Sequence, residues 1–168
     1  MLDMELSEQD KHSLNLGRLV GNLQSLEFAL RAFLVNSEIA SGASFPQSAS
    51  LDKMNEGEIV PKNAFTNYDS LEKIIKKYNR DPKILAAGLT IDKSLVAVRD
   101  AIAHGRVSAP APSASLRLLK FGKPENNQVK VVFSVTMTRE WLAEQIKRAY
   151  EAVLKVSEAN ERLRSGRL

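Results

Sequence analysis

The sequence contains no cysteine, which excludes disulfide bonds, thiol nucleophiles and every zinc or iron–sulfur site that needs a cysteine ligand. Aromatic residues make up only 6% of the chain, which favours a helical core of Leu, Ile, Val and Ala over a β-sandwich. No apolar stretch approaches the roughly 18 uninterrupted residues that a membrane span needs, and residues 1–10 are acidic and polar rather than signal-like. We therefore expect a protein without a membrane span in a reducing, cytoplasmic compartment.

The common catalytic signatures are also missing. There is no glycine-rich phosphate loop, no His-Glu-x-x-His pair and no nucleophile elbow, and the only histidines are His12 and His104. Metal-dependent and catalytic-triad chemistry are therefore disfavoured, and we predict neither a metal nor a cofactor. His12 lies in the first turn of a predicted helix among polar neighbours, which is typical of an ordinary surface residue.

The size and charge of the chain are those of a small globular protein. With 168 residues, 43% of them hydrophobic, it can build one proper core, so we predict a single domain over residues 1–168. The 24 Lys and Arg residues exceed the 20 Asp and Glu residues by four, a mild excess that permits a polyanionic partner such as RNA without requiring one.

Apolar spacing predicts a long amphipathic helix at the start of the chain, with a capping box at Ser7 and Asp10 and a last core position at Leu34. Periodicity then vanishes, and small polar residues and two prolines accumulate over about residues 37–67. This segment is predicted to be a long loop, a feature that is uncommon unless it covers a site, orders on binding or is flexible.

A short two-faced helix follows, for which Asp69 and Glu72 form a predicted capping box. One face is apolar, and the other carries four basic residues: Lys73, Lys76, Lys77 and Arg80. These cations are candidates for contacts with RNA phosphates, and the alternative interpretation is a solvated helix surface.

The second half of the chain combines helices with a small β-structure. A helix is predicted over Ile91–Gly105, a stiff connector over Val107–Ala114 and a β-hairpin over about residues 115–136. Thr138 is the predicted cap of a last helix. The fold class is therefore mainly α, with a β-hairpin inserted before the C-terminal helix.

The strongest candidate for chemistry is the polar group Arg99, Asp100 and His104, which interrupts an otherwise apolar helix. Asp100 and His104 lie one turn apart on the same side of that helix. A carboxylate in that position can accept a hydrogen bond from one imidazole nitrogen and leave the other free to transfer a proton. The guanidinium of Arg99 can reach toward a phosphate and neutralise its developing charge.

The run Arg-Asp-Ala-Ile-Ala-His-Gly resembles the motif of HEPN domains, with the family's Arg and His at Arg99 and His104 and its intervening polar residue at Asp100. The resemblance implies a HEPN-type helical bundle in which two protomers pair, so that both motifs face one cleft, and RNA cleavage without a metal. Arg106, just after the motif, is a further candidate for RNA binding. By resemblance, such a protein is often the toxin of a toxin–antitoxin pair or a defence effector, held in check by a partner protein.

On this hypothesis His104 withdraws a proton from a ribose 2′-hydroxyl, Arg99 stabilises the charged phosphate, and the product carries a 2′,3′-cyclic phosphate. Three alternatives remain. The chain can be a non-catalytic HEPN module that binds RNA or a nucleotide, or one that only dimerises as a scaffold. It can also be a structural helical adaptor. In a purely structural interpretation, His104 only interacts favourably with the helix dipole at the C-terminal end of its helix, and Arg99 pairs with Glu27 or Asp100.

Overall fold

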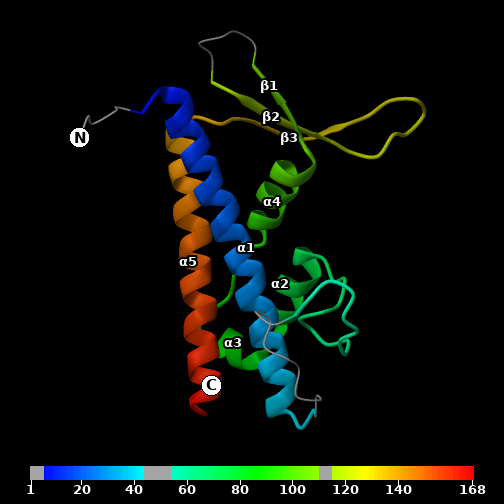
Figure 1. Ribbon diagram of the computed structural model, residues 1–168, viewed down its shortest axis with the longest axis vertical. Helices are drawn as coiled ribbons and strands as arrows, with labels where there is room; N and C mark the ends of the chain where they lie inside the picture. Colours follow the sequence, from blue (N-terminus) through cyan, green and yellow to red (C-terminus); the bar gives the residue numbers. More distant parts are fainter. Residues whose placement is uncertain (1–5, 44–53, 110–114) are drawn as a thin grey trace. The chain divides into compact units, whose positions relative to one another are not determined.

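A computed structural model describes residues 6–43, 54–109 and 115–168 (Figure 1). The protein is mainly helical, and a small antiparallel sheet precedes the last helix, which confirms this part of the predicted fold class. The elements, in chain order, are α1 (Glu8–Ala40), α2 (Leu71–Arg80), α3 (Pro82–Ala86), α4 (Ser94–His104), β1 (Arg106–Ser108), β2 (Arg117–Phe121), β3 (Val131–Thr136) and α5 (Arg139–Arg164).

The chain divides into two compact units, and α1 and α5 each contribute to both. The first unit comprises Met1–Gln24 and Asp92–Glu151, and the second comprises Ser25–Ile91 and Ala152–Leu168. The first unit therefore holds α4 and the sheet, whereas the second holds α2 and α3. A single domain over residues 1–168 stays a prediction.

In the first unit, the early turns of α1 lie beside the early turns of α5 (Figure 1). The capping box predicted for α1 is present, since the amide of Asp10 donates to Ser7 Oγ over 3.1 Å and the Ser7 amide donates to the Asp10 carboxylate over 3.2 Å. Asn22 Nδ2 donates to the Ile146 carbonyl over 3.2 Å and joins the two helices. The apolar core of this unit is built from one stripe of each helix and from β2, namely Leu19, Leu23, Leu95, Val98, Leu118 and Leu142.

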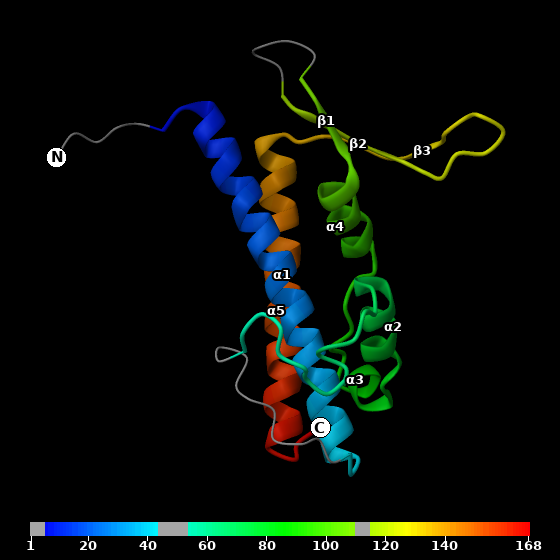
Figure 2. The ribbon, with the colours of Figure 1, turned by 45° about the vertical axis from the view of Figure 1, so that its right-hand side comes forward.

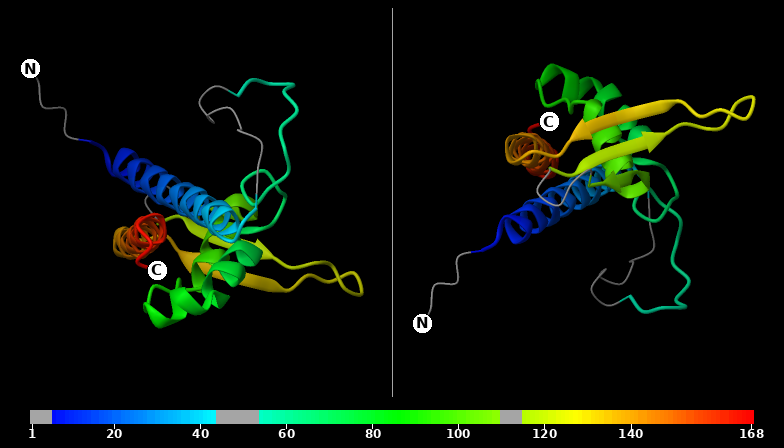
Figure 3. Two further views of the ribbon diagram at one scale, coloured as in Figure 1. Left: turned by 90° about the horizontal axis from the view of Figure 1, so that it is seen from below. Right: turned by 90° about the horizontal axis from the view of Figure 1, so that it is seen from above.

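The sheet has the order β1-β2-β3 with antiparallel pairing throughout, and Figure 3 shows β2 and β3 continuing together into their connecting loop. Asn126 and Asn127 both have positive φ, of 49° and 59°, as a two-residue hairpin turn of type I′ requires. The predicted hairpin is thus confirmed. The interpretation of Val107–Ala114 as a connector is wrong at its start, because β1 pairs there with β2; residues 110–114 lie outside the described part of the chain.

In the second unit, α2 and α3 lie next to each other (Figure 2), and Tyr78 is central to the core. Its ring meets the ring of Phe33 edge to face at 4.9 Å, and its hydroxyl donates to the Leu89 carbonyl over 3.0 Å. Burial raises the pKa of Tyr78 far above its ordinary value. The predicted apolar face of α2 is confirmed, since Leu71, Ile74, Ile75 and Tyr78 are all buried.

The capping box predicted at Asp69 and Glu72 is wrong by one residue. Ser70 is the N-cap of α2, and its hydroxyl accepts from the Lys73 amide over 3.4 Å. The Asp69 carboxylate instead accepts from Lys77 Nζ over 2.6 Å. A serine hydroxyl suits the cap as well as a carboxylate does, and pairing with lysine is more favourable for the charged group.

The predicted loop over residues 37–67 begins later than expected, because α1 continues to Ala40. Residues 44–53 lie outside the described part of the chain, and the described remainder, 54–70, forms turns without a helix or strand. Asn63 and Thr66 close one turn through their side chains, and Phe65 meets Phe28 of α1 edge to face at 5.2 Å. This part of the loop is therefore anchored to α1.

Thr138 caps the last helix as predicted, because its hydroxyl accepts from the Trp141 amide over 3.1 Å. None of the helices in the described parts of the chain combines the length and the apolar character that a bilayer crossing needs.

Candidate functional site

The site is built on α4, which begins three residues later than predicted, at Ser94. Asp92 stabilises the N-terminus of this helix, because its carboxylate accepts a hydrogen bond from the Ser94 amide over 2.8 Å and one from the Ser94 hydroxyl over 2.7 Å. Arg148 of α5 binds the same carboxylate over 2.7 Å and also contacts Ser94 and the buried Gln145. The helix is thereby fixed at its N-terminal end within the first unit.

The apolar side of α4 carries Leu95, Val98 and Ala101, all of which are buried. The polar residues of the motif consequently lie on the remaining surface of the helix, as its periodicity predicts. Arg99 and Asp100 are half-buried, and His104 is exposed in the last turn.

Gly105 ends α4 and begins the turn into β1. Its φ of −78° is accessible to any residue, so its glycine character has another cause. A Cβ at this position would lie 2.3 Å from the Ala101 carbonyl oxygen and 2.8 Å from both Leu118 Cδ1 and the Leu119 carbonyl oxygen. The glycine that follows the motif histidine therefore allows β2 to pack directly against the end of α4.

That close packing brings β2 to Asp100. One carboxylate oxygen of Asp100 lies 3.3 Å from Arg99 Nη1, and the other lies 3.3 Å from Lys120 Nζ of β2. The side chains of Lys120 and Asp100 are 26% and 35% exposed, so the pair is only partly shielded from water. Asp100 therefore lies between two cations.

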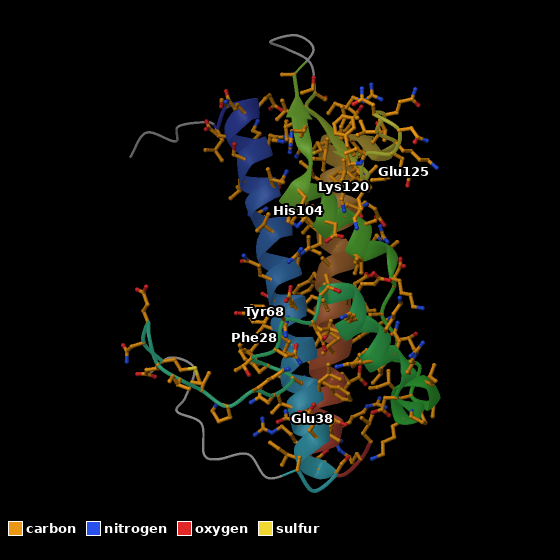
Figure 4. All side chains as sticks on the ribbon, turned by 90° about the vertical axis from the view of Figure 1, so that its right-hand side faces the viewer. Phe28, Glu38, Tyr68, His104, Lys120 and Glu125 are labelled. Carbon is orange, nitrogen blue, oxygen red and sulfur yellow. The ribbon has the colours of Figure 1, made fainter. Side chains whose placement is uncertain are left out.

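The hydrogen bond predicted from the His104 imidazole to Asp100 is not formed in the single chain. Both oxygens of Asp100 are engaged by cations, which compete more strongly for a carboxylate than a neutral imidazole does. Among the described residues, His104 has no side-chain hydrogen-bond partner. Figure 4 labels His104 on α4 and Lys120 on the adjacent strand β2.

This arrangement offers an exposed imidazole at a helix end, beside a cluster of one carboxylate and two cations. The imidazole is accessible for proton transfer, and the cations create a local field that attracts a polyanion.

Arg106, the last predicted site residue of this unit, is exposed on β1. Within residues 6–43, 54–109 and 115–168, no three His, Asp or Glu side chains gather closely enough to hold a metal ion.

The four basic residues of α2 lie in the second unit, and all of them are exposed as predicted. Lys76 pairs with Glu72 over 2.6 Å, and Lys77 pairs with Asp69 over the same distance. The hydrogen bond from Lys77 lowers the pKa of Asp69. Much of the positive charge on this face is therefore balanced locally, as expected for a solvated helix surface.

The interpretation of His12 as ordinary surface is only partly right, because its side chain is half-buried. Its Nε2 atom is buried and has no hydrogen-bond partner in the described part of the chain.

Lys120 is the functional candidate that sequence reasoning missed. It is separated from Asp100 by 20 residues, and only the pairing of β1 with β2 brings it there. The sequence did contain an indication, because Lys120 is a charged residue between the apolar Leu119 and Phe121 of a predicted strand. Such a residue often pairs with an opposite charge on its own face of the sheet.

Comparisons of the chain with protein-family models, with curated proteins and with solved structures found no match.

Proposed function

We propose that the protein is a metal-independent endoribonuclease of the HEPN type, with His104 as general base. The observation that carries this proposal is the exposed imidazole at the end of α4 beside the Arg99, Asp100 and Lys120 cluster. The Arg-Asp-Ala-Ile-Ala-His-Gly run supplies the family resemblance. A homodimer, a cytoplasmic location and an antitoxin or other regulatory partner belong to the same proposal.

In the proposed reaction, His104 removes the proton from a ribose 2′-hydroxyl, and the resulting oxygen attacks the adjacent phosphorus. The bond from phosphorus to the 5′-oxygen breaks, that oxygen takes up a proton from solvent, and a 2′,3′-cyclic phosphate remains. Arg99 stabilises the charge on the phosphate. The contacts of Asp100 favour a different role from the one first expected, because it holds Lys120 and Arg99 together instead of orienting the imidazole.

The test compares the full chain with a His104→Ala variant on mixed RNA in the presence of a chelator. We expect the variant to lose about 10²- to 10⁴-fold in cleavage rate, the usual contribution of a general base. A matched control is Arg18→Ala, which removes an exposed cation from α1 and should cleave like the parent protein. DNA of the same sequence should resist, because it lacks the attacking hydroxyl.

Equal cleavage by the parent and His104→Ala, or cleavage by neither, would remove the catalytic claim. Circular dichroism of each variant checks that the helices are intact. The 3′ ends of the products should resist phosphatase until mild acid opens the cyclic phosphate, and directly accessible 3′-phosphates would contradict the proposed chemistry.

A second candidate is a non-catalytic HEPN module that binds RNA. It is favoured by one observation, namely that both oxygens of Asp100 contact cations, so this carboxylate does not orient the imidazole in the single chain. RNA binding that persists in His104→Ala, without cleavage by the parent protein, would support this candidate.

A further inference from the structure

The hairpin of β2 and β3 extends beyond the part that packs on α4. Leu118 is buried against the end of that helix, but almost every residue from Phe121 to Val132 is exposed. We call residues 120–132 the hairpin arm. A two-stranded ribbon that buries neither face has little stability of its own, so an arm of this kind is suited to contact a ligand.

The arm is basic. It carries Lys120, Lys123 and Lys130, and its single acidic residue is Glu125 at the turn. Lys123 and Lys130 are exposed, and neither is ion-paired with any residue that the structure describes. Their charge is therefore available to an anionic ligand, in contrast to that of the locally paired lysines on α2.

Strand register places two of these lysines on one face. The amide of Gly122 donates to the Lys130 carbonyl over 2.8 Å, so these two residues lie opposite each other across the ribbon. Residues directly opposite share a face, and residues two apart along a strand share it too, about 6.8 Å apart. Lys130 therefore lies on the side of the ribbon that Lys120 occupies on β2, beyond a shift in strand register between Lys120 and Phe121, and Lys120 contacts Asp100 of α4. The Val132 side chain lies beside Gly122, since a Cβ at Gly122 would be 3.1 Å from Val132 Cγ1.

We propose that the hairpin arm binds the backbone of a single-stranded RNA substrate, with phosphates at Lys130 on this face and at Lys123 farther along the arm. The inference rests on the proposed function in taking RNA as the ligand and deepens it by assigning a binding track that begins at the motif. Charge complementarity favours RNA over a second copy of the arm, since two copies would bring like charges together.

The experiment measures binding of a labelled, unstructured RNA of about 15 nucleotides to the full chain carrying His104→Ala, so that the RNA is not cut. The test variant adds Lys123→Ala and Lys130→Ala. The matched control adds Lys147→Ala and Lys155→Ala instead, which remove the same charge from exposed positions of α5.

We expect the arm variant to bind about 10- to 25-fold more weakly at 0.1 M salt. The slope of log affinity against log salt should fall in magnitude by about 1.4, because each phosphate contact to a single strand contributes about 0.7. The control should bind as the unsubstituted background does. Equal affinities and slopes in the arm variant and the control would overturn the inference.

Two further measurements separate this inference from the proposed function. If the solution mass of the arm variant falls while its RNA affinity does not, the two lysines serve a protein interface, and the inference is overturned. If the arm variant binds RNA weakly although the parent protein cleaves none, the arm inference holds and the ribonuclease proposal fails. Cleavage that depends on His104, together with unchanged binding in the arm variant, would overturn the arm inference and support the ribonuclease proposal.

Discussion

The charged clusters around Arg31 and Asp100 use the same residue types for different purposes. Arg31 of α1, in the second unit, is 12% exposed and donates to the Glu27 carboxylate, to the carbonyls of Ala64, Asn67 and Asp69, and to the Asn67 side chain. Asp100, in the first unit, is half-exposed between Arg99 and Lys120, beside the exposed His104.

The difference lies in burial and in the kind of partner. Arg31 directs its donors to backbone carbonyls of the 64–69 turn, which fixes that turn on α1 and leaves the guanidinium little access to a ligand. The Asp100 cluster is partly open to water, and a phosphate can compete with the Asp100 carboxylate for its cations. We infer that the first cluster stabilises the fold and that the second is available for binding and chemistry.

The largest effect on stability should follow from Arg31→Met. It removes the nearly buried guanidinium that donates to the Glu27 carboxylate and to several backbone carbonyls, so the free energy of unfolding should fall by about 3 to 5 kcal/mol. Urea denaturation measures this change. Arg18→Met on the same helix is the control and should cost less than about 0.5 kcal/mol, since Arg18 is exposed. A similar small cost for both variants would refute the structural role of Arg31.

The next largest effect should come from Gly105→Ala at the end of α4. Its methyl group would collide with the Ala101 carbonyl oxygen of α4 and with the Leu119 carbonyl oxygen of β2, so the end of the helix and the strand would have to move apart, and we expect a loss of about 2 to 3 kcal/mol. Thermal denaturation provides the measurement. Gly17→Ala is a suitable control because a Cβ there meets no atom within 4 Å, and it should be neutral or stabilising in the helix. If both alanines are tolerated equally, β2 does not pack tightly on the motif.

The helices and the surface of the motif were predictable because they follow from local periodicity. The buried face of α2, the caps at Ser7 and Thr138, and the exposure of His104 all depend on residues within one or two helical turns. Such features are set by the repeat of the helix, and tertiary packing did not override them.

The partners of Asp100 and Arg31 were not predictable, because they come from distant segments. Lys120 reaches Asp100 only through the pairing of β1 with β2, and β1 is a three-residue strand, too short to show alternation. Arg31 binds carbonyl groups 33 to 38 residues away, and a carbonyl carries no signal in the sequence. The buried Nε2 of His12 was missed because polar neighbours in sequence say nothing about neighbours in space.

A smaller effect should distinguish the ion pair of Lys120 and Asp100 from the Arg31 cluster. Because both side chains are partly exposed, Lys120→Met should cost only about 0.5 to 1 kcal/mol in the free energy of unfolding. A double-mutant cycle with Asp100→Asn isolates the pair, and we expect a coupling energy in the same range. Coupling above about 3 kcal/mol would show that this cluster is structural in the same sense as Arg31, which would weaken its proposed role in binding.

The smallest effect concerns the other end of α4, where Asp92 pairs with Arg148 and is more exposed than either Glu27 or Asp100. Hydrogen bonds from the Ser94 amide and hydroxyl lower the pKa of Asp92, and Arg148 lowers it further. Because the folded-state pKa lies below the ordinary value of 3.8, the stabilisation is complete above that value and is lost as the pH falls through the lowered one. Asp92→Asn should therefore cost about 0.5 kcal/mol at pH 7, and the difference from the parent protein should vanish once the pH has fallen below the lowered pKa of Asp92. Urea denaturation of both proteins at several pH values measures this, and a difference that grew on acidification would show that the charged form of Asp92 is not the one that holds the helix.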